Sequence, residues 1–155
     1  MNSFFEIKQI DRDTVNYLVR NLEDFEKYKA IRSGLGAAGG VFKVAGKNRL
    51  KQRMKSGSKG VTGNLLRSFD VRIKKYRPGV LIGFREGKGG GSHAHLIDRG
   101  TTDRFYITKK GNRKSTGSVT GNAFWADTEA QDQPRAMDKL YEGIEKAVNR
   151  INNRQ

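Results

Sequence analysis

The sequence contains no cysteine, only two prolines and two histidines, and a single tryptophan among its 155 residues. The absence of cysteine excludes a disulfide-stapled scaffold, a thiolate zinc finger and a thiol nucleophile. No apolar run approaches the roughly 18 residues that a membrane-spanning helix needs, and the start of the chain lacks the pattern of a secretory signal peptide. The length fits one core, so we expect residues 1–155 to form a single domain.

Acidic residues are scarce in the middle of the chain. The whole sequence has 31 Lys and Arg against 16 Asp and Glu, which gives a net charge of +15. Residues 34–121 hold 20 of the basic residues, four of the acidic ones and 18 of the 19 glycines. Two charge-balanced ends therefore flank a basic, glycine-rich middle, and this charge favours a polyanionic or acidic partner.

Apolar residues at helical spacing predict two helices near the start of the chain. The first covers Val15 to Leu22, and the second begins after a cap at Asp24 and follows a long apolar stripe. Several glycines interrupt this stripe, and each costs up to about 1 kcal/mol in a helix interior. Two alternatives follow: the helix breaks near Gly39 and Gly40, or its small residues let another backbone come close. We favour one long helix, with a kink at these glycines.

The middle of the chain predicts a small antiparallel sheet. Apolar and polar residues alternate from Phe69 to Ile73, and the turn signal Arg77-Pro78-Gly79 leads into the apolar segment 80–84. These two segments are typical of a hairpin. We expect three further short strands, over residues 3–10, 95–97 and 105–107.

The last third of the chain combines a loop with a helix. Segment 109–121 is polar, basic and contains glycine, so we expect a mobile loop. Apolar residues from Met137 to Ile151 predict an amphipathic helix, with Pro134 in its first turn. The order of helices, sheet and helix predicts an α+β fold, in which a small antiparallel sheet packs against a long N-terminal helix and a C-terminal amphipathic helix.

Two segments contain residue types that are common in ligand-binding sites, but neither has the full pattern of such a site. His93 and His95, with Asp98 nearby, are metal-ligand types, because two imidazoles and a carboxylate can hold zinc. They are the only histidines, and we favour surface or packing roles. Segment 86–92 is glycine-rich, but Lys88 comes too early for a phosphate-binding loop, whose Lys ends the loop where a helix begins. We interpret it as the tip of a hairpin or of a linker, and we predict no metal and no cofactor.

Catalytic patterns are equally sparse. The four acidic residues of the middle segment are dispersed, and no order of Ser, His and Asp indicates a nucleophile. A small hydrolase or nuclease built on His93, His95 and Asp98 stays an alternative, but we predict a protein that is not an enzyme and has no catalytic residues.

Four lysines spaced four residues apart form the strongest charge pattern. Lys43, Lys47, Lys51 and Lys55 lie on one ridge of the predicted helix, where like charges repel by a few tenths of a kcal/mol per pair. Phosphate groups would relieve this repulsion with release of counterions. The ridge lacks interleaved aromatic residues, so base stacking is not indicated. A non-specific nucleic-acid-binding module that uses residues 43–77 is therefore one functional hypothesis; a solvated face or a contact with an acidic subunit are the others.

Three local patterns occur in a fixed order along the chain. They are Thr62-Gly63-Asn64-Leu65-Leu66-Arg67-Ser68 after the long helix, His95-Leu96-Ile97-Asp98-Arg99-Gly100-Thr101 after the hairpin, and Ala123-Phe124-Trp125-Ala126 before the last helix. Together they resemble the tail-component or tail-completion family of long-tailed bacteriophages and prophages, of the lambdoid Hong Kong ninety-seven type. The residues that carry the resemblance are Thr62, Gly63, Leu65, Ser68, Asp98, Gly100, Thr101, Phe124 and Trp125.

The resemblance implies a structural virion protein that joins or completes the tail at the head–tail interface without catalysis. It implies a ring of identical subunits, with other neck and tail proteins as partners and DNA passing through the lumen. The expected location is the virion, after assembly in the bacterial cytoplasm; no membrane or small-molecule partner is expected. The residues expected to face DNA or acidic partner surfaces are Lys43, Lys47, Lys51, Lys55, Lys109, Lys110, Arg113 and Lys114.

Overall fold

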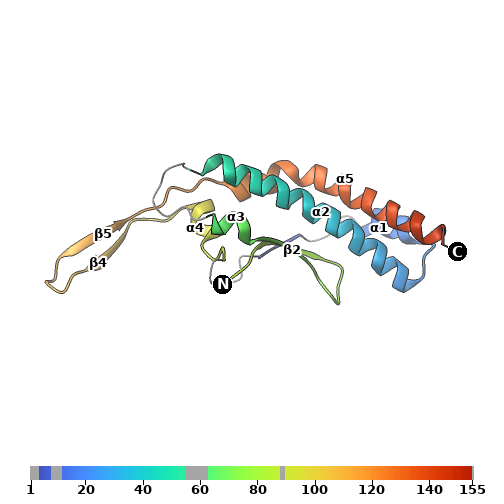
Figure 1. Ribbon diagram of the computed structural model, residues 1–155, viewed down its shortest axis with the longest axis horizontal. Coiled ribbons are helices and arrows are strands. Elements are labelled where there is room, and N and C mark those ends of the chain that lie inside the picture. The colour runs from blue at the N-terminus through green and yellow to red at the C-terminus, as the bar shows by residue number, and fades with distance from the viewer. Residues whose placement is uncertain (1–3, 8–11, 55–62, 88–89, 155) are drawn as a thin grey trace.

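Two long helices lie side by side and run in opposite directions along the molecule (Figure 1). Helix α2 (Asp24–Arg53) starts with a capping box, in which the side chains of Glu23 and Glu26 each accept a hydrogen bond from the other's backbone N–H. Helix α5 (Phe124–Asn152) packs along it, and the short helix α1 (Arg12–Val19) packs against α5. The computed structural model describes residues 4–7, 12–54, 63–87 and 90–154.

A three-stranded antiparallel sheet covers the face of α2 that α5 leaves open. Its order is β1 (Phe4–Ile7), β3 (Val80–Phe84) and β2 (Phe69–Ile73). In the β2–β3 hairpin Phe69 pairs with Phe84, and Ile73 pairs with Val80. The predicted hairpin is confirmed, and so is a strand within residues 3–10, although only its 4–7 portion lies in the described part of the chain.

Several glycines of α2 lie where other elements approach it closely. A Cβ atom on Gly34 would lie 2.5 Å from the carbonyl oxygen of Leu140 in α5, and one on Gly39 would lie 2.6 Å from the side chain of Val71 in β2. The helix continues through all of these glycines. Close approach of neighbouring elements is therefore the correct one of the two alternatives, and glycine lets α2 fit between α5 and the sheet.

The core is built around four aromatic side chains at one end of the sheet. The ring of Phe69 lies 4.2 Å from that of Phe84 and 5.9 Å from that of Trp125, and Phe124 contacts Phe69 edge-on. All four side chains are buried. Burial of this much apolar area joins the sheet to the start of α5. The elements and their order confirm the predicted α+β fold. None of the described helices is apolar over a length that would cross a membrane.

The strand predicted over residues 95–97 is wrong. This segment lies in a helix, α4 (Ala94–Arg99), because Ala94, Ile97 and Asp98 sit three and four residues apart and all turn toward the body. A second short helix, α3 (Asn64–Ser68), was not predicted; it follows Gly63, whose φ of 71° favours glycine.

The C-terminal helix begins ten residues earlier than Pro134, so the prediction that this proline sits in the first turn is wrong. Pro134 lies inside α5 on an exposed position. A missing backbone N–H costs less there, because water can bind the carbonyl group that loses its partner. The early start comes from the buried Phe124 and Trp125, which extend the apolar stripe toward the sheet.

The segment predicted as a mobile loop, residues 109–121, contains a strand. Strands β4 (Arg104–Ile107) and β5 (Arg113–Gly117) form an antiparallel hairpin, which confirms the strand predicted over 105–107. The turn between them is closed by a hydrogen bond from the N–H of Gly111 to the carbonyl of Thr108, at 2.9 Å, with Gly111 at a φ of 77°. This hairpin, named the arm from here on, projects away from the body (Figure 1).

Candidate assembly and nucleic-acid-facing surfaces

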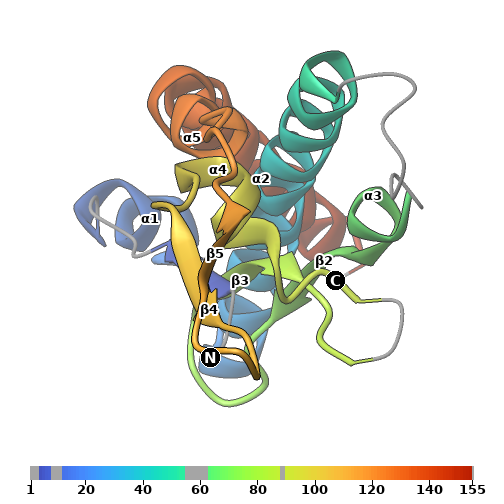
Figure 2. The ribbon, with the colours of Figure 1, turned by 90° about the vertical axis from the view of Figure 1, so that its left-hand side faces the viewer.

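The arm is exposed on both of its faces. All strand residues of β4 and β5 are exposed, including the large apolar side chains of Phe105 and Ile107, which are 48% and 75% exposed. The guanidinium group of Arg113 stacks over the ring of Phe105, 3.9 Å from its centre. Figure 2 looks along the molecule from the arm's end and shows the arm standing in front of the body. The arm thus offers cationic and apolar groups to another molecule.

The structure places four of the sequence-predicted basic residues on the arm. Lys109 and Lys110 form its turn, and Arg113 and Lys114 begin β5; all four side chains are exposed. Arg104, Phe105 and Tyr106 belong to the same ribbon but were not predicted as partner-facing residues. The Lys-Lys-Gly turn between two segments with alternating side chains was the signal that could have identified them.

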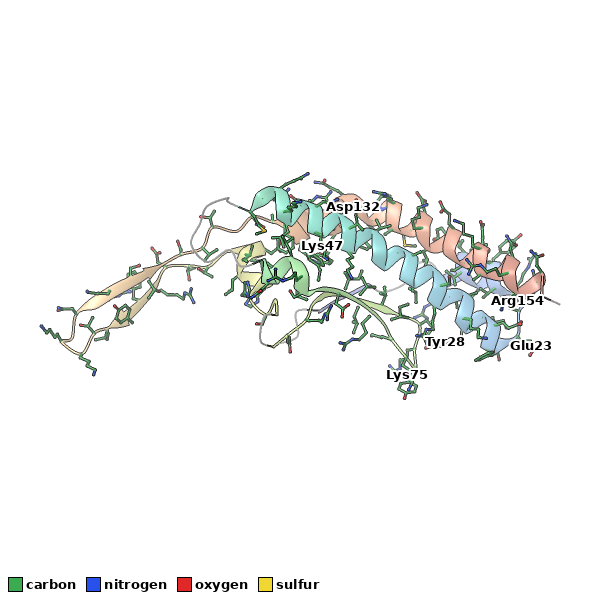
Figure 3. The ribbon with its side chains drawn as sticks, viewed as in Figure 1. Glu23, Tyr28, Lys47, Lys75, Asp132 and Arg154 are labelled. Carbon is green, nitrogen blue, oxygen red and sulfur yellow. The ribbon has the colours of Figure 1, made fainter. Side chains whose placement is uncertain are left out.

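The prediction that four lysines lie along one ridge of α2 is partly confirmed. Lys43, Lys47 and Lys51 lie on one continuous helix, four residues apart, whereas Lys55 lies outside the described residues. Lys51 is exposed, but Lys43 and Lys47 are half-buried. Figure 3 shows Lys47 away from the helix end that carries Glu23. The ridge therefore presents less free charge than the spacing alone indicates.

Two further cationic residues of α2 form salt bridges with α5. Arg49 forms a salt bridge with Asp132 and hydrogen bonds with Thr128 and Gln131 on α5. Arg53 binds Asp127 at 2.6 Å. These ion pairs fix the end of α2 on the start of α5, so both arginines have a structural role that periodicity did not reveal.

Asp98 has a structural role that the sequence did not show. Its buried carboxylate accepts hydrogen bonds from the backbone N–H of Trp125, at 2.7 Å, and of Ala126, at 3.4 Å. The carboxylate therefore caps the first turn of α5 and lies at the positive end of the helix dipole. The bond joins the second and third patterns of the family resemblance.

Two residues that follow Asp98 in the chain also stabilise the region between α4 and α5. Gly100 has a φ of 80° and lies so close to Gly121 that a Cβ atom would be 2.6 Å from its nitrogen. Thr101 exchanges two hydrogen bonds with Val119, one from its N–H at 2.8 Å and one to its hydroxyl at 2.9 Å. These contacts close the base of the arm.

The first pattern of the resemblance anchors the sheet. Leu65 is buried, and the hydroxyl of the buried Ser68 donates a hydrogen bond to the carbonyl of Leu65 at 2.9 Å. Gly63 takes a left-handed conformation before α3. Thr62 lies outside the described residues. The pattern is thus a turn and an anchor in the described part of the chain.

The metal and phosphate alternatives gain no support from the geometry. His93 and His95 are exposed, and the carboxylate of Asp98 is occupied by α5. Within the part of the chain that the structure describes, no three metal-ligating side chains cluster together. In the glycine segment, the N–H groups of Gly90 and Gly91 donate to the carbonyls of Gly87 and Arg85, so they do not point at a ligand.

An open hollow lies beside the junction of α4 and α5. It has a volume of about 500 Å³ and is lined by Asp98, Arg99, Trp125 and Glu129, among others. Burial raises the pKa of Glu129 above its ordinary value, and the nearby charge of Asp98 adds to the effect, although a hydrogen bond with Trp125 acts in the opposite direction.

Comparisons with protein-family models, with curated proteins and with solved structures found no match for this chain.

Proposed function

We propose that this protein is a structural component of a long-tailed phage or prophage virion, which joins or completes the tail at the head–tail interface and performs no catalytic step. The residues that carry the resemblance to that family support the proposal, because those in the described part have structural roles. Asp98 caps α5, Gly100 closes the base of the arm, and Phe124 and Trp125 fill the core.

The arm is the observation that carries the proposal. A two-stranded hairpin alone in water is marginally stable, and this one exposes all of its strand residues, among them Phe105 and Ile107. Such an element gains its full order when another molecule covers it. Identical subunits that meet head to tail through their less charged helices would close into a ring and leave the arm free for another partner.

The test is to purify the particles that are produced by a bacterium carrying this gene and to identify their proteins by mass spectrometry. We expect this chain in intact particles, at a fixed number of copies per particle. Tails that form without attached heads are expected when the gene is deleted. A chain absent from the particles, with normal particles formed in the deletion strain, would contradict the proposal.

A second function, non-specific nucleic-acid binding through residues 43–77, is favoured by the three lysines on one ridge of α2. The triple variant Lys43→Gln, Lys47→Gln, Lys51→Gln tests it with a labelled DNA duplex. Each lost phosphate contact should reduce the salt dependence of log K by about 0.9. An unchanged salt dependence would argue against this function.

A further inference from the structure

The arm carries five positive charges and no negative charge between its first and last strand residues. These cations are Arg104, Lys109, Lys110, Arg113 and Lys114. All five side chains are exposed. Charges this close along one ribbon repel each other, because salt screens them only beyond about 8 Å at physiological ionic strength. A polyanion laid along the arm removes this repulsion and releases its own counterions.

Aromatic rings lie next to the cations on both faces of the arm. The register pairs Tyr106 with Lys114 and Ile107 with Arg113. Tyr106 is 50% exposed, and Phe105, on the opposite face, lies under Arg113. Cations that follow a phosphate backbone, together with exposed aromatic rings, are the composition of nucleic-acid-binding surfaces. The α2 ridge lacks this combination.

The turn between β2 and β3 has the same composition. Its tip holds Lys75, Tyr76 and Arg77; Tyr76 is 85% exposed, and Lys75 Nζ lies 5.3 Å from the centre of its ring. The hydroxyl of Tyr28 on α2 donates to the carbonyls of Lys74 and Lys75, so the turn is held to the body (Figure 3). In Figure 1 the arm projects from one end of the molecule, beyond the start of α5, and the turn points away from the sheet on the side opposite α5.

We infer that the arm and the β2–β3 turn are a binding surface for the sugar–phosphate backbone of double-stranded DNA. The same two segments of a second copy are poor occupants of this surface, because the arm and the turn carry only positive charges. The major groove, about 12 Å wide, admits a two-stranded β-ribbon such as the arm. The inference rests on the proposed function in one respect: the DNA meant is the duplex that a head–tail joining protein encounters.

The experiment measures binding of the full chain to a fluorescent duplex of about 30 base pairs, by anisotropy, at several salt concentrations. The arm variant is Lys109→Gln, Lys110→Gln, Arg113→Gln, Lys114→Gln. The matched control is Arg135→Gln, Lys146→Gln, Arg150→Gln, Arg154→Gln, which removes the same charge from exposed positions on α5 and at its C-terminal end.

We expect the unmodified chain to bind the duplex with a steep salt dependence. The arm variant should bind at least about tenfold more weakly at low salt, and its slope of log K against log salt should fall by about three to four, because up to four phosphate contacts are lost. The control should keep most of the affinity and slope. Both variants should remain folded, because the changed side chains are exposed. Thermal unfolding checks that they are.

Three results would overturn the inference. The first is that the unmodified chain binds no duplex. The second is that the arm variant and the control lose affinity equally, because binding would then depend only on overall charge. The third is that the chain binds an acidic polypeptide more tightly than the duplex, because the surface would then be a protein-binding site. Particle composition separates this inference from the proposed function. A chain found in particles that binds no DNA refutes only the arm inference, whereas arm-dependent DNA binding by a chain absent from particles refutes only the virion role.

Discussion

Asp98 shows how one side chain sets the start of a helix. Replacing it with alanine removes the acceptor for the N–H of Trp125 in a buried place, so Asp98→Ala should lower the free energy of unfolding by about 1–2 kcal/mol. Urea denaturation measures this. The exposed Asp103→Ala is the control and should change stability by less than about 0.5 kcal/mol. Equal losses in the two variants would refute the capping role.

Gly39 and Gly40 are adjacent in α2 but face different surroundings. A Cβ atom at Gly39 would collide with Val71, whereas none of the described atoms lies within 4 Å of one at Gly40. Gly39→Ala should therefore destabilise the protein by about 1–3 kcal/mol. Gly40→Ala should stabilise it by about 0.5–1 kcal/mol, because alanine has the higher helix propensity. Thermal and urea unfolding of the two variants measure the difference, and effects of the same sign would contradict the packing of α2.

Glu129 and Glu142 should affect stability with opposite dependence on pH. Burial raises the pKa of Glu129, so the folded protein holds this proton more tightly than the unfolded chain, and the carboxylate reduces stability as pH rises through that range. A hydrogen bond from Lys139 lowers the pKa of Glu142, so its favourable contribution is present above the ordinary value of 4.5 and is lost as pH falls.

The test compares Glu129→Gln and Glu142→Gln with the unmodified protein by urea denaturation from acidic to neutral pH. Relative to the unmodified protein, Glu129→Gln should become more stable as pH rises. Glu142→Gln should become less stable over the same range. If stability depends on pH in the same way in all three proteins, the surroundings of Glu129 and Glu142 differ from those in the structure.

At the scale of elements, periodicity predicted the long helices and the β2–β3 hairpin, because each buries one face over many residues. It failed for α4, whose six residues are too short for a period of 3.6 to stand out from one of two. It placed the start of α5 too late, since Pro134 is a strong signal for a first turn and its tolerance at an exposed position depends on the surrounding fold. Short or exposed elements carry little hydrophobic pattern.

The arm illustrates the same limit for the candidate site. Its basic residues were predicted to face a partner, but their polar surroundings favoured a loop over a ribbon. The signal for a strand lay in the turn chemistry at Gly111. The contacts of Arg49 and Arg53 with α5 were not predictable, because they join residues about 80 positions apart in the chain.

The arm should make almost no contribution to the stability of the body. Replacing residues 105–115 with an Asn-Gly turn removes only exposed side chains from the strands, so the free energy of unfolding should stay within about 0.5 kcal/mol. Urea denaturation measures it, with the full-length protein as the reference. A loss of more than about 2 kcal/mol would mean that the arm belongs to the folding core.

At the scale of the whole molecule, the charge-balanced and the basic segments of the sequence form different elements. The balanced ends of the chain form β1, α1, the start of α2 and α5, whereas the basic middle forms the rest of α2, strands β2 and β3, the arm and the turn that holds Lys75 (Figure 3). Subunits that meet through their less charged parts would place the basic elements together. Such an arrangement gives a ring a basic lining, as a conduit for DNA requires.

The most direct test of this account is the mass of the purified protein in solution, followed by multi-angle light scattering as its concentration rises. Closed assembly predicts a transition from the 17.4 kDa monomer to a plateau at one integer multiple of that mass. A mass that stays at 17.4 kDa at every concentration, or one that grows without a plateau, would contradict a ring-forming building block.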